Sequence, residues 1–258
     1  MLRWVAWVFV IFGTIGPESM IDAYVQQGRF KQAHAFVDEI QRGLESARTP
    51  EPAMMIRARM RLLLAERDWN EGRAVAARCR ADEPIVCTFA EGYAAARLAW
   101  PGAKPEFITE ASICARQLEQ QVRNPVSVTE LYRVLLRAAI AAAQEETPEL
   151  ELLIAHAESL EQRLRDTGQI DVPLQPASEI AGDLWLQVYR DESARQSYRA
   201  TLEAWPRRAG SLIGVARASA RLHDDAAATE AYRALLDVWQ AADPQRPELL
   251  EARRAIAR

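Results

Sequence analysis

The chain has 258 residues with 36 acidic and 32 basic side chains, which gives a formal net charge of −4 at pH 7. Nucleic-acid-binding domains usually carry a basic surplus, so this balance argues against a nucleic-acid partner. Hydrophobic residues make up 49% of the chain and glycines number only 11. That composition supplies a sizeable core and favours helices over sheets joined by glycine-rich turns.

The first residues form a segment of their own. One basic residue, Arg3, precedes an unbroken apolar run over residues 4–12, and a Gly-Pro-containing stretch follows it. The run is shorter than the ~20 residues that a membrane-spanning helix needs and matches the apolar part of a secretory signal. No Ala-x-Ala cleavage site follows, so residues 1–16 are expected to be a signal peptide or a short N-terminal anchor. Export to the periplasm or association with the inner membrane through residues 4–12 is then expected; a first repeat helix and a cytoplasmic location are the alternative.

Further along, the chain alternates between helical segments and short breaks, and no stretch shows the alternating pattern of a strand. Proline and acidic residues that follow a break, as in Thr49-Pro50-Glu51, predict helix starts. Up to the longest break, helices are expected over 17–27, from the turn at 28–30 to about 46, and over 51–66, 69–81, 84–100, 105–122, 127–144 and 147–166. Residues 167–176 are expected to form a joint. The C-terminal part is expected to contain helices over 177–189, 191–204, 209–222, 224–241 and 246–257.

Two segments near the C-terminus match at a spacing of 34 residues. Ala194, Tyr198 and Trp205 recur as Ala228, Tyr232 and Trp239, and Arg199, Ala200 and Leu202 recur at the same spacing. The alanine and the tyrosine four residues later lie on one helix face, where the small side chain allows a neighbouring helix to approach. We therefore expect Tyr198 and Tyr232 to be buried between adjacent helical hairpins.

This pattern resembles the tetratricopeptide repeat, in which glycine and an aromatic residue in a first helix precede alanine and an aromatic residue in a second, and proline closes the unit. The chain supplies Gly182, Trp185, Ala194, Tyr198 and Pro206 in that order. The core of a further repeat is matched at the N-terminal end by Tyr24, Gly28, Phe30 and Ala33, and weaker copies lie over 53–84 and around Ala216, Ala228 and Tyr232.

The resemblance implies an all-α, right-handed solenoid of antiparallel helical hairpins. Repeats are expected over 17–166, degenerate in 85–166, and over 177–258, where the last helix caps the array. Proteins of this family hold partner proteins, so the resemblance also implies a non-catalytic scaffold or adaptor that binds a protein or peptide on its concave face. A cytoplasmic regulatory module of a signalling or secretion system is the alternative, and a helical-toroid hydrolase is disfavoured because no separate catalytic domain is present.

No catalytic signature supports an enzyme. The glutamates and aspartates lie on amphipathic helices, where a solvated face is the usual role, and no phosphate-binding loop or nucleophile motif occurs. The three histidines lie far apart and the cysteines have no metal-ligand spacing, so we expect neither metal nor cofactor. Cys79 and Cys87 flank one predicted turn, and either a disulfide or buried free thiols would suit them.

The expected partner-binding residues are three arginine pairs on first helices of the hairpins, at a spacing of four. Such pairs can hold carboxylates of an acidic peptide or a C-terminus. The family's carboxylate clamp uses lysine and asparagine instead, so binding of chaperone tails is not implied. Glu179 and Asp183 face the same way and make the expected groove less basic. The candidate residues are Arg57, Arg61, Arg133, Arg137, Arg217 and Arg221.

Overall fold

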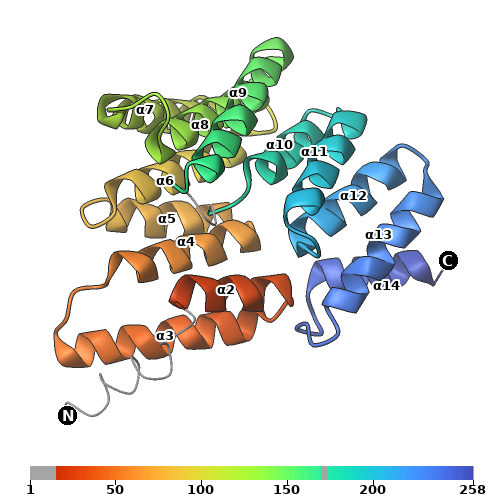
Figure 1. Ribbon diagram of the computed structural model, residues 1–258, viewed down its shortest axis with the longest axis horizontal. Coiled ribbons are helices and arrows are strands. Elements are labelled where there is room, and N and C mark those ends of the chain that lie inside the picture. Colours follow the sequence, from red (N-terminus) through yellow and green to blue (C-terminus); the bar gives the residue numbers. More distant parts are fainter. Residues whose placement is uncertain (1–15, 170–173, 258) are drawn as a thin grey trace.

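The computed structural model describes residues 16–169 and 174–257, and in these residues the protein is all-α, with thirteen helices and no strand (Figure 1). The expected helices are all present, with ends within a few residues of their predicted positions. Their bounds are α2 (Pro17–Gln26), α3 (Phe30–Ala47), α4 (Ala53–Glu66), α5 (Trp69–Cys79), α6 (Pro84–Ala99), α7 (Pro105–Gln121), α8 (Val128–Ala143), α9 (Thr147–Asp166), α10 (Ala177–Gln187), α11 (Asp191–Ala204), α12 (Ala209–Arg221), α13 (Asp225–Val238) and α14 (Pro247–Ile256).

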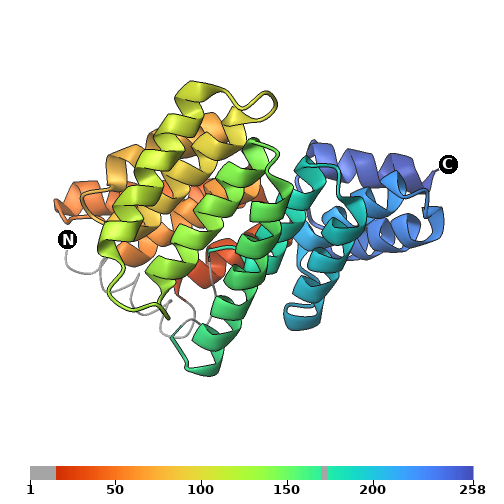
Figure 2. The same cartoon turned by 90° about the horizontal axis from the view of Figure 1, so that it is seen from above.

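Each helix packs against the next one along the chain, as expected of helical hairpins. The even-numbered helices form a second set of contacts: α2 meets α4, α4 meets α6, α6 meets α8, α8 meets α10 and α10 meets α12. Helix α12 then returns to α2, so the inner helices surround a common centre (Figures 1 and 2). The fold class is therefore confirmed as all-α, whereas the right-handed solenoid stays a prediction.

Small residues allow the close helix contacts. Tyr198 of α11 is fully buried, and its ring fits between Gly182 of α10 and Gly214 of α12. A methyl group on Gly182 would lie 2.6 Å from the Tyr198 ring, and one on Gly214 would also overlap it. Tyr232 is 5% exposed and occupies the equivalent position in α13. The prediction that both tyrosines are buried between hairpins is thus confirmed.

The degenerate region, residues 85–166, is held by a different set of aromatic residues. Phe89 of α6 stacks on Tyr132 of α8 at a centroid distance of 4.5 Å and on Tyr93 at 5.6 Å. Trp69 of α5 meets Tyr93 edge to face. Stacked and edge-to-face aromatic pairs contribute beyond their buried area, so these rings take over the packing role of the repeat tyrosines.

The turn between α5 and α6 is closed covalently. Cys79 at the end of α5 and Cys87 near the start of α6 form a disulfide, with their Cα atoms 5.9 Å apart. Of the two alternatives for this pair, the disulfide is correct and free thiols are wrong. Cys114 in α7 is a buried free thiol, and burial raises its pKa to about 12, so it acts as a small apolar residue.

The expected signal peptide or anchor over 1–16, including its apolar run at 4–12, lies outside the described residues except for Gly16. The same holds for the middle of the expected joint at 167–176. In the part of the chain that the structure describes, no helix has the length and hydropathy to cross a membrane.

Candidate functional site

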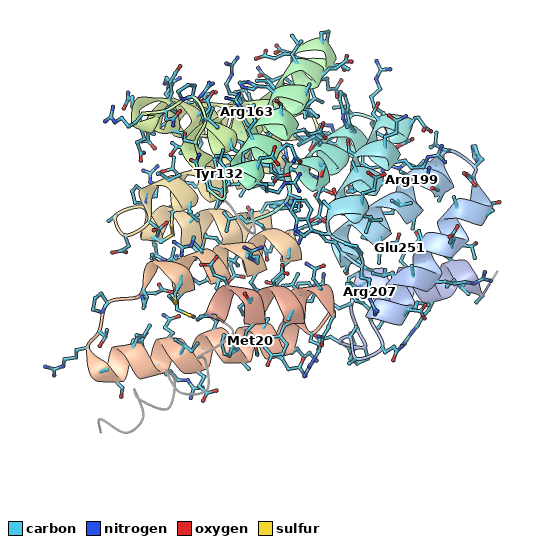
Figure 3. All side chains as sticks on the ribbon, in the orientation of Figure 1. Met20, Tyr132, Arg163, Arg199, Arg207 and Glu251 are labelled. Carbon is cyan, nitrogen blue, oxygen red and sulfur yellow. A yellow bond between two sulfur atoms is a disulfide. The ribbon has the colours of Figure 1, made fainter. Side chains whose placement is uncertain are left out.

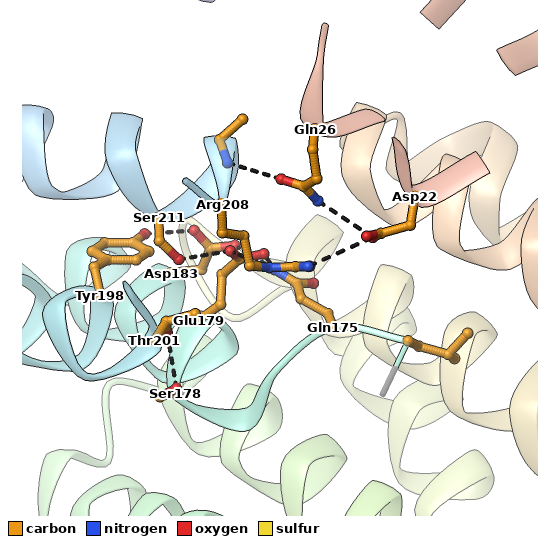
Figure 4. Close-up of polar contacts among 12 residues, drawn as sticks. Asp22, Gln26, Gln175, Ser178, Glu179, Asp183, Tyr198, Thr201, Arg208 and Ser211 are labelled. Carbon is orange, nitrogen blue, oxygen red and sulfur yellow. Dashed lines mark hydrogen bonds and ion pairs between the residues drawn. The ribbon is translucent and has the colours of Figure 1, made fainter. Parts of the chain in front are cut away.

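The centre surrounded by the inner helices contains buried charged and polar side chains rather than an open groove (Figure 4). We call this cluster the polar junction. It joins the N-terminal hairpins to the C-terminal ones through residues of α2, α10, α11 and α12 and residues next to the ends of α4, α10 and α12. Its members are Asp22, Gln26, Arg67, Gln175, Glu179, Asp183, Tyr198, Arg208 and Ser211.

Glu179 and Arg208 form the heart of the polar junction, and both are buried. Arg208, which directly precedes α12, donates from Nε to Glu179 at 2.8 Å, and its other end lies 3.6 Å from Asp22 of α2. Glu179 also accepts hydrogen bonds from Ser211 Oγ at 2.7 Å and Gln175 Nε2 at 3.1 Å. A buried carboxylate needs such donors to offset its desolvation, and here it has three.

Asp183, one turn further along α10, is held in the same way. It accepts from Arg67 at 2.8 Å and from the Tyr198 hydroxyl at 2.6 Å. Arg67 directly follows α4, so this ion pair links the N-terminal hairpins to α10. Burial and the nearby Asp183 raise the pKa of the Tyr198 hydroxyl well above its usual value, so this group remains a donor at all physiological pH values.

A second set of contacts, the terminal clasp, ties the turn between α2 and α3 to the C-terminal hairpin. Trp239 Nε1 donates to the Gln26 carbonyl at 3.0 Å, and the Gln26 side chain accepts from the Ala209 backbone N–H at 2.8 Å. Asp243 donates its backbone N–H to the Gly28 carbonyl at 3.0 Å, and its carboxylate accepts from the Lys31 N–H at 2.9 Å. The clasp therefore joins segments more than 180 residues apart in sequence.

The space left between the polar junction and the clasp is a cavity of about 60 Å³, bordered by Arg67, Arg208, Arg217 and Arg246. Small-molecule sites usually enclose about 300–1,000 Å³, so this cavity has room for a few water molecules only. Each of the four guanidinium groups is paired with a carboxylate, namely Asp183, Glu179, Glu251 and Glu248. No unneutralised charge remains there to attract an ion.

Two of the six predicted partner-binding arginines point toward this centre. Arg57 donates to Glu18 at 2.9 Å. Arg61 is only 3% exposed and lies near Glu18, Asp22 and the Leu174 carbonyl. Burial lowers the pKa of its guanidinium, against the opposing effect of Asp22. In this arrangement the α2 carboxylates and Leu174 cover Arg61, and its use in partner binding stays a prediction.

The other four arginines lie in two separate places. Arg217 makes a bidentate ion pair with Glu251 of α14, and Arg221 donates to the Leu186 carbonyl and lies 3.2 Å from Asp191. Arg133 makes a bidentate pair with Glu130, and Arg137 pairs with Glu149. The three pairs therefore do not line one groove, although their use in partner binding stays an untested prediction.

Sequence reasoning identified Glu179 and Asp183 but not their partners, Arg67 and Arg208. Both arginines lie at helix boundaries, outside the periodic pattern that assigns a helix face. The available signal was the position of two carboxylates on the inward face of one helix, because a carboxylate that becomes buried there requires a basic or hydrogen-bonding partner. Among the described residues, no cluster of three or more histidine, cysteine, aspartate or glutamate side chains could hold a metal ion.

Glu161 of α9 lies beside the polar junction and gives a pH-dependent prediction. It is buried and accepts the Ala177 backbone N–H at 2.9 Å, and burial raises its pKa from 4.5 to about 7. The folded state thus binds this proton more tightly than the unfolded state, so the free energy of unfolding falls as pH rises from about 4.5 to 7.

Glu161→Gln should remove this fall with pH and stabilise the protein at pH 8 by about 1–3 kcal/mol. Urea unfolding at pH 4.5 and pH 8 measures the free energy of unfolding of the unaltered chain and of Glu161→Gln. An equal change of this free energy with pH in the two proteins would contradict the prediction.

The clasp depends on Gly28, whose φ is +71°. A methyl group there would lie 2.7 Å from the Ala242 Cβ and 2.9 Å from the Trp239 ring. Gly168 is a matched control, since its φ is +67° and nothing lies within 4 Å of its would-be Cβ. Both alanine variants should lose about 1–2 kcal/mol through backbone strain, but Gly28→Ala should lose about 1–3 kcal/mol more through the clash. Hydrogen exchange over residues 239–246 should accelerate in Gly28→Ala alone; equal exchange in the two variants would mean that the clasp does not hold these residues.

Comparison with models of protein families, with curated proteins and with solved structures finds no match to this chain. The resemblance to tetratricopeptide repeats therefore rests on the residues that carry it, such as Gly182, Tyr198 and Tyr232, and on the helical hairpins in which they lie.

Proposed function

We propose that the chain is a non-catalytic scaffold that holds a protein partner, built as a right-handed, tetratricopeptide-like solenoid whose first and last hairpins meet. The observation that carries this proposal is the closed set of inner helices, in which buried arginines and carboxylates neutralise one another. A catalytic carboxylate has to reach a substrate, whereas Glu179 and Asp183 are buried and accept hydrogen bonds from within the chain.

The closure changes where a partner would bind. In an open solenoid the first helices of the hairpins line a concave binding surface. Here that surface is occupied by the polar junction and the terminal clasp, so the partner contacts the outside of the closed arrangement. The clasp and the junction then serve to hold the outer surfaces of the hairpins in one relative position, which reduces the entropy lost when a partner binds.

The Cys79–Cys87 disulfide supports a location in the cell envelope, because disulfides persist in oxidising compartments such as the bacterial periplasm. A cytoplasmic regulatory module is the alternative. Cells are quenched with acid and denatured without reductant, their free thiols are alkylated with a reagent of high mass, and the protein is separated by gel electrophoresis. Modification of Cys114 alone fits the envelope, whereas modification of all three thiols would contradict it.

The scaffold proposal is tested by cross-linking the tagged, full-length chain in its native host and identifying the captured proteins by mass spectrometry. The control is the Tyr198→Ala variant at equal abundance, in which the hairpins are expected to be destabilised. Enrichment of one or a few proteins by the unaltered chain alone supports a scaffold. Recovery of no protein above the control, or of the same proteins with both baits, would overturn it.

A further inference from the structure

The outside of the molecule has a hollow between α7 and α9, whose floor is one side of α8. Its volume is about 260 Å³. We call it the outer groove. Arg133 and Arg137, one of the three predicted arginine pairs, line it from α8, and Arg116 lines it from α7. Arg116 was not among the predicted residues, because α7 is the second helix of its hairpin and only first helices were expected to face a partner.

The three arginines differ in how firmly they are held. Arg133 is fixed by its bidentate pair with Glu130, with both distances at 2.6 Å. Arg137 pairs with Glu149, but these side chains are 46% and 42% exposed, and an exposed ion pair contributes only about 0–1 kcal/mol. Arg116 is exposed and has no hydrogen bond or ion pair within the described residues. The side chains of Arg116 and Arg137 can therefore turn toward an incoming carboxylate with little loss of stabilising free energy.

The apolar lining of the groove consists of Ile140 and Ala141 of α8 and Ala115 of α7, and Gln144 also borders the groove. The volume is below the range of about 300–1,000 Å³ that encloses a whole small molecule. It is large enough for one or two side chains of a peptide that continues across the surface on either side.

Charge selects the peptide. Arg116 is exposed and Arg137 is held only by an exposed ion pair, so both guanidinium groups can meet carboxylates of an incoming segment. We propose that the outer groove binds an extended acidic segment of a partner protein, with one carboxylate against Arg137 and another against Arg116. This inference rests on the proposed scaffold function and names the class of segment that the scaffold holds.

The groove also contains acidic side chains, Glu119 and Glu149. They reduce its positive charge, so binding depends on contacts of carboxylates with individual guanidinium groups. Glu149 in particular competes with the peptide for Arg137. Removing its charge should therefore tighten binding, which a merely structural role of Glu149 would not produce.

The test measures fluorescence anisotropy of a labelled peptide that contains Glu-Ala-Glu-Ala-Glu, with the Gln-Ala-Gln-Ala-Gln peptide as its neutral match. The unaltered full-length chain should bind the acidic peptide at least about tenfold more tightly than the neutral one. Arg116→Glu and Arg137→Glu should each weaken binding about tenfold, and Glu149→Gln should strengthen it about threefold, as expected for release of an exposed ion pair.

The charge-matched control is Arg199→Glu. Arg199 lies exposed on α11, outside the groove (Figure 3), so this variant should bind the peptide as the unaltered chain does. Circular dichroism confirms that all variants are folded. Equal binding by Arg137→Glu and Arg199→Glu, or no preference for the acidic peptide, would overturn the assignment of the groove. If cross-linking in the host still captured a partner, the scaffold proposal would stand without it.

Discussion

Replacing Tyr198 with alanine is expected to lower the free energy of unfolding by about 3–5 kcal/mol, out of a total of ~5–15 kcal/mol for a typical domain. The ring is fully buried between Gly182 and Gly214, and two glycine surfaces cannot collapse easily onto the space that it leaves. The variant also deprives Asp183 of the Tyr198 hydroxyl, one of its three hydrogen-bond donors.

Two further variants separate these effects. Tyr198→Phe keeps the ring and removes the hydroxyl only, so it should lose about 1–3 kcal/mol. Tyr189→Ala removes a tyrosine that is 69% exposed and should change stability by no more than about 0.5 kcal/mol. Urea unfolding monitored by circular dichroism provides the comparison. A loss in Tyr198→Ala no larger than that in Tyr189→Ala would show that the repeat register is wrong.

The closure of the fold also changes how the Tyr198→Ala variant should unfold. In a nearest-neighbour solenoid the C-terminal hairpins would melt first and leave the N-terminal half intact. Here Arg67 and Arg208 connect both halves through Asp183, Glu179 and Asp22. We therefore expect the N-terminal half to lose stability together with the C-terminal half, so that one broadened transition replaces two separate steps.

The second large effect is expected for Glu179→Ala, which should destabilise the protein by about 3–5 kcal/mol. The substitution leaves the buried Arg208 guanidinium with Asp22 alone, at 3.6 Å, and an uncompensated buried charge is among the most unfavourable changes in a folded protein. Ser211 loses its acceptor as well. The matched control is Glu192→Ala, because Glu192 pairs with Arg195 at the surface and should contribute about 0–1 kcal/mol.

A double variant tests whether the pair acts as a unit. Replacing Glu179 with leucine and Arg208 with methionine removes both charges and retains the volume, so it should recover most of the stability that Glu179→Ala loses. Chemical unfolding of Glu179→Leu, Arg208→Met and the double variant gives the coupling energy. If the double variant were less stable than Glu179→Leu by the full effect of Arg208→Met, the two residues would be independent and the ion pair would not hold the halves together.

The helices of this protein could be predicted from the sequence because their signals are local. Proline and acidic residues mark their starts, and the spacing of Ala194, Tyr198 and Leu202 along one face depends only on the pitch of a helix. The same periodicity correctly predicted that Tyr198 and Tyr232 are buried. It also placed Glu179 and Asp183 on the inward side of α10.

The candidate site could be predicted only in part. The sequence placed Arg61, Glu179 and Asp183 toward the centre, but an inward direction does not reveal whether that centre is open to a partner. The tertiary contacts decide this, because α2 and Leu174 bury Arg61 and the return of α12 to α2 brings Asp22 to Arg208. The choice between a disulfide and free thiols at Cys79 and Cys87 likewise depended on the distance across one turn.

By itself, the sequence determined the all-α class, the helix boundaries and the buried faces of the repeats, since each depends on residues within about one hairpin. Only the tertiary structure decided that the first and last hairpins meet, that side chains fill the centre between the inner helices and that Arg116 joins Arg133 and Arg137 at an outer groove. The contacts that close the fold, such as the one from Trp239 to Gln26, join residues with no common period. They follow from the small rotations between successive hairpins, summed over the chain, which no local pattern records.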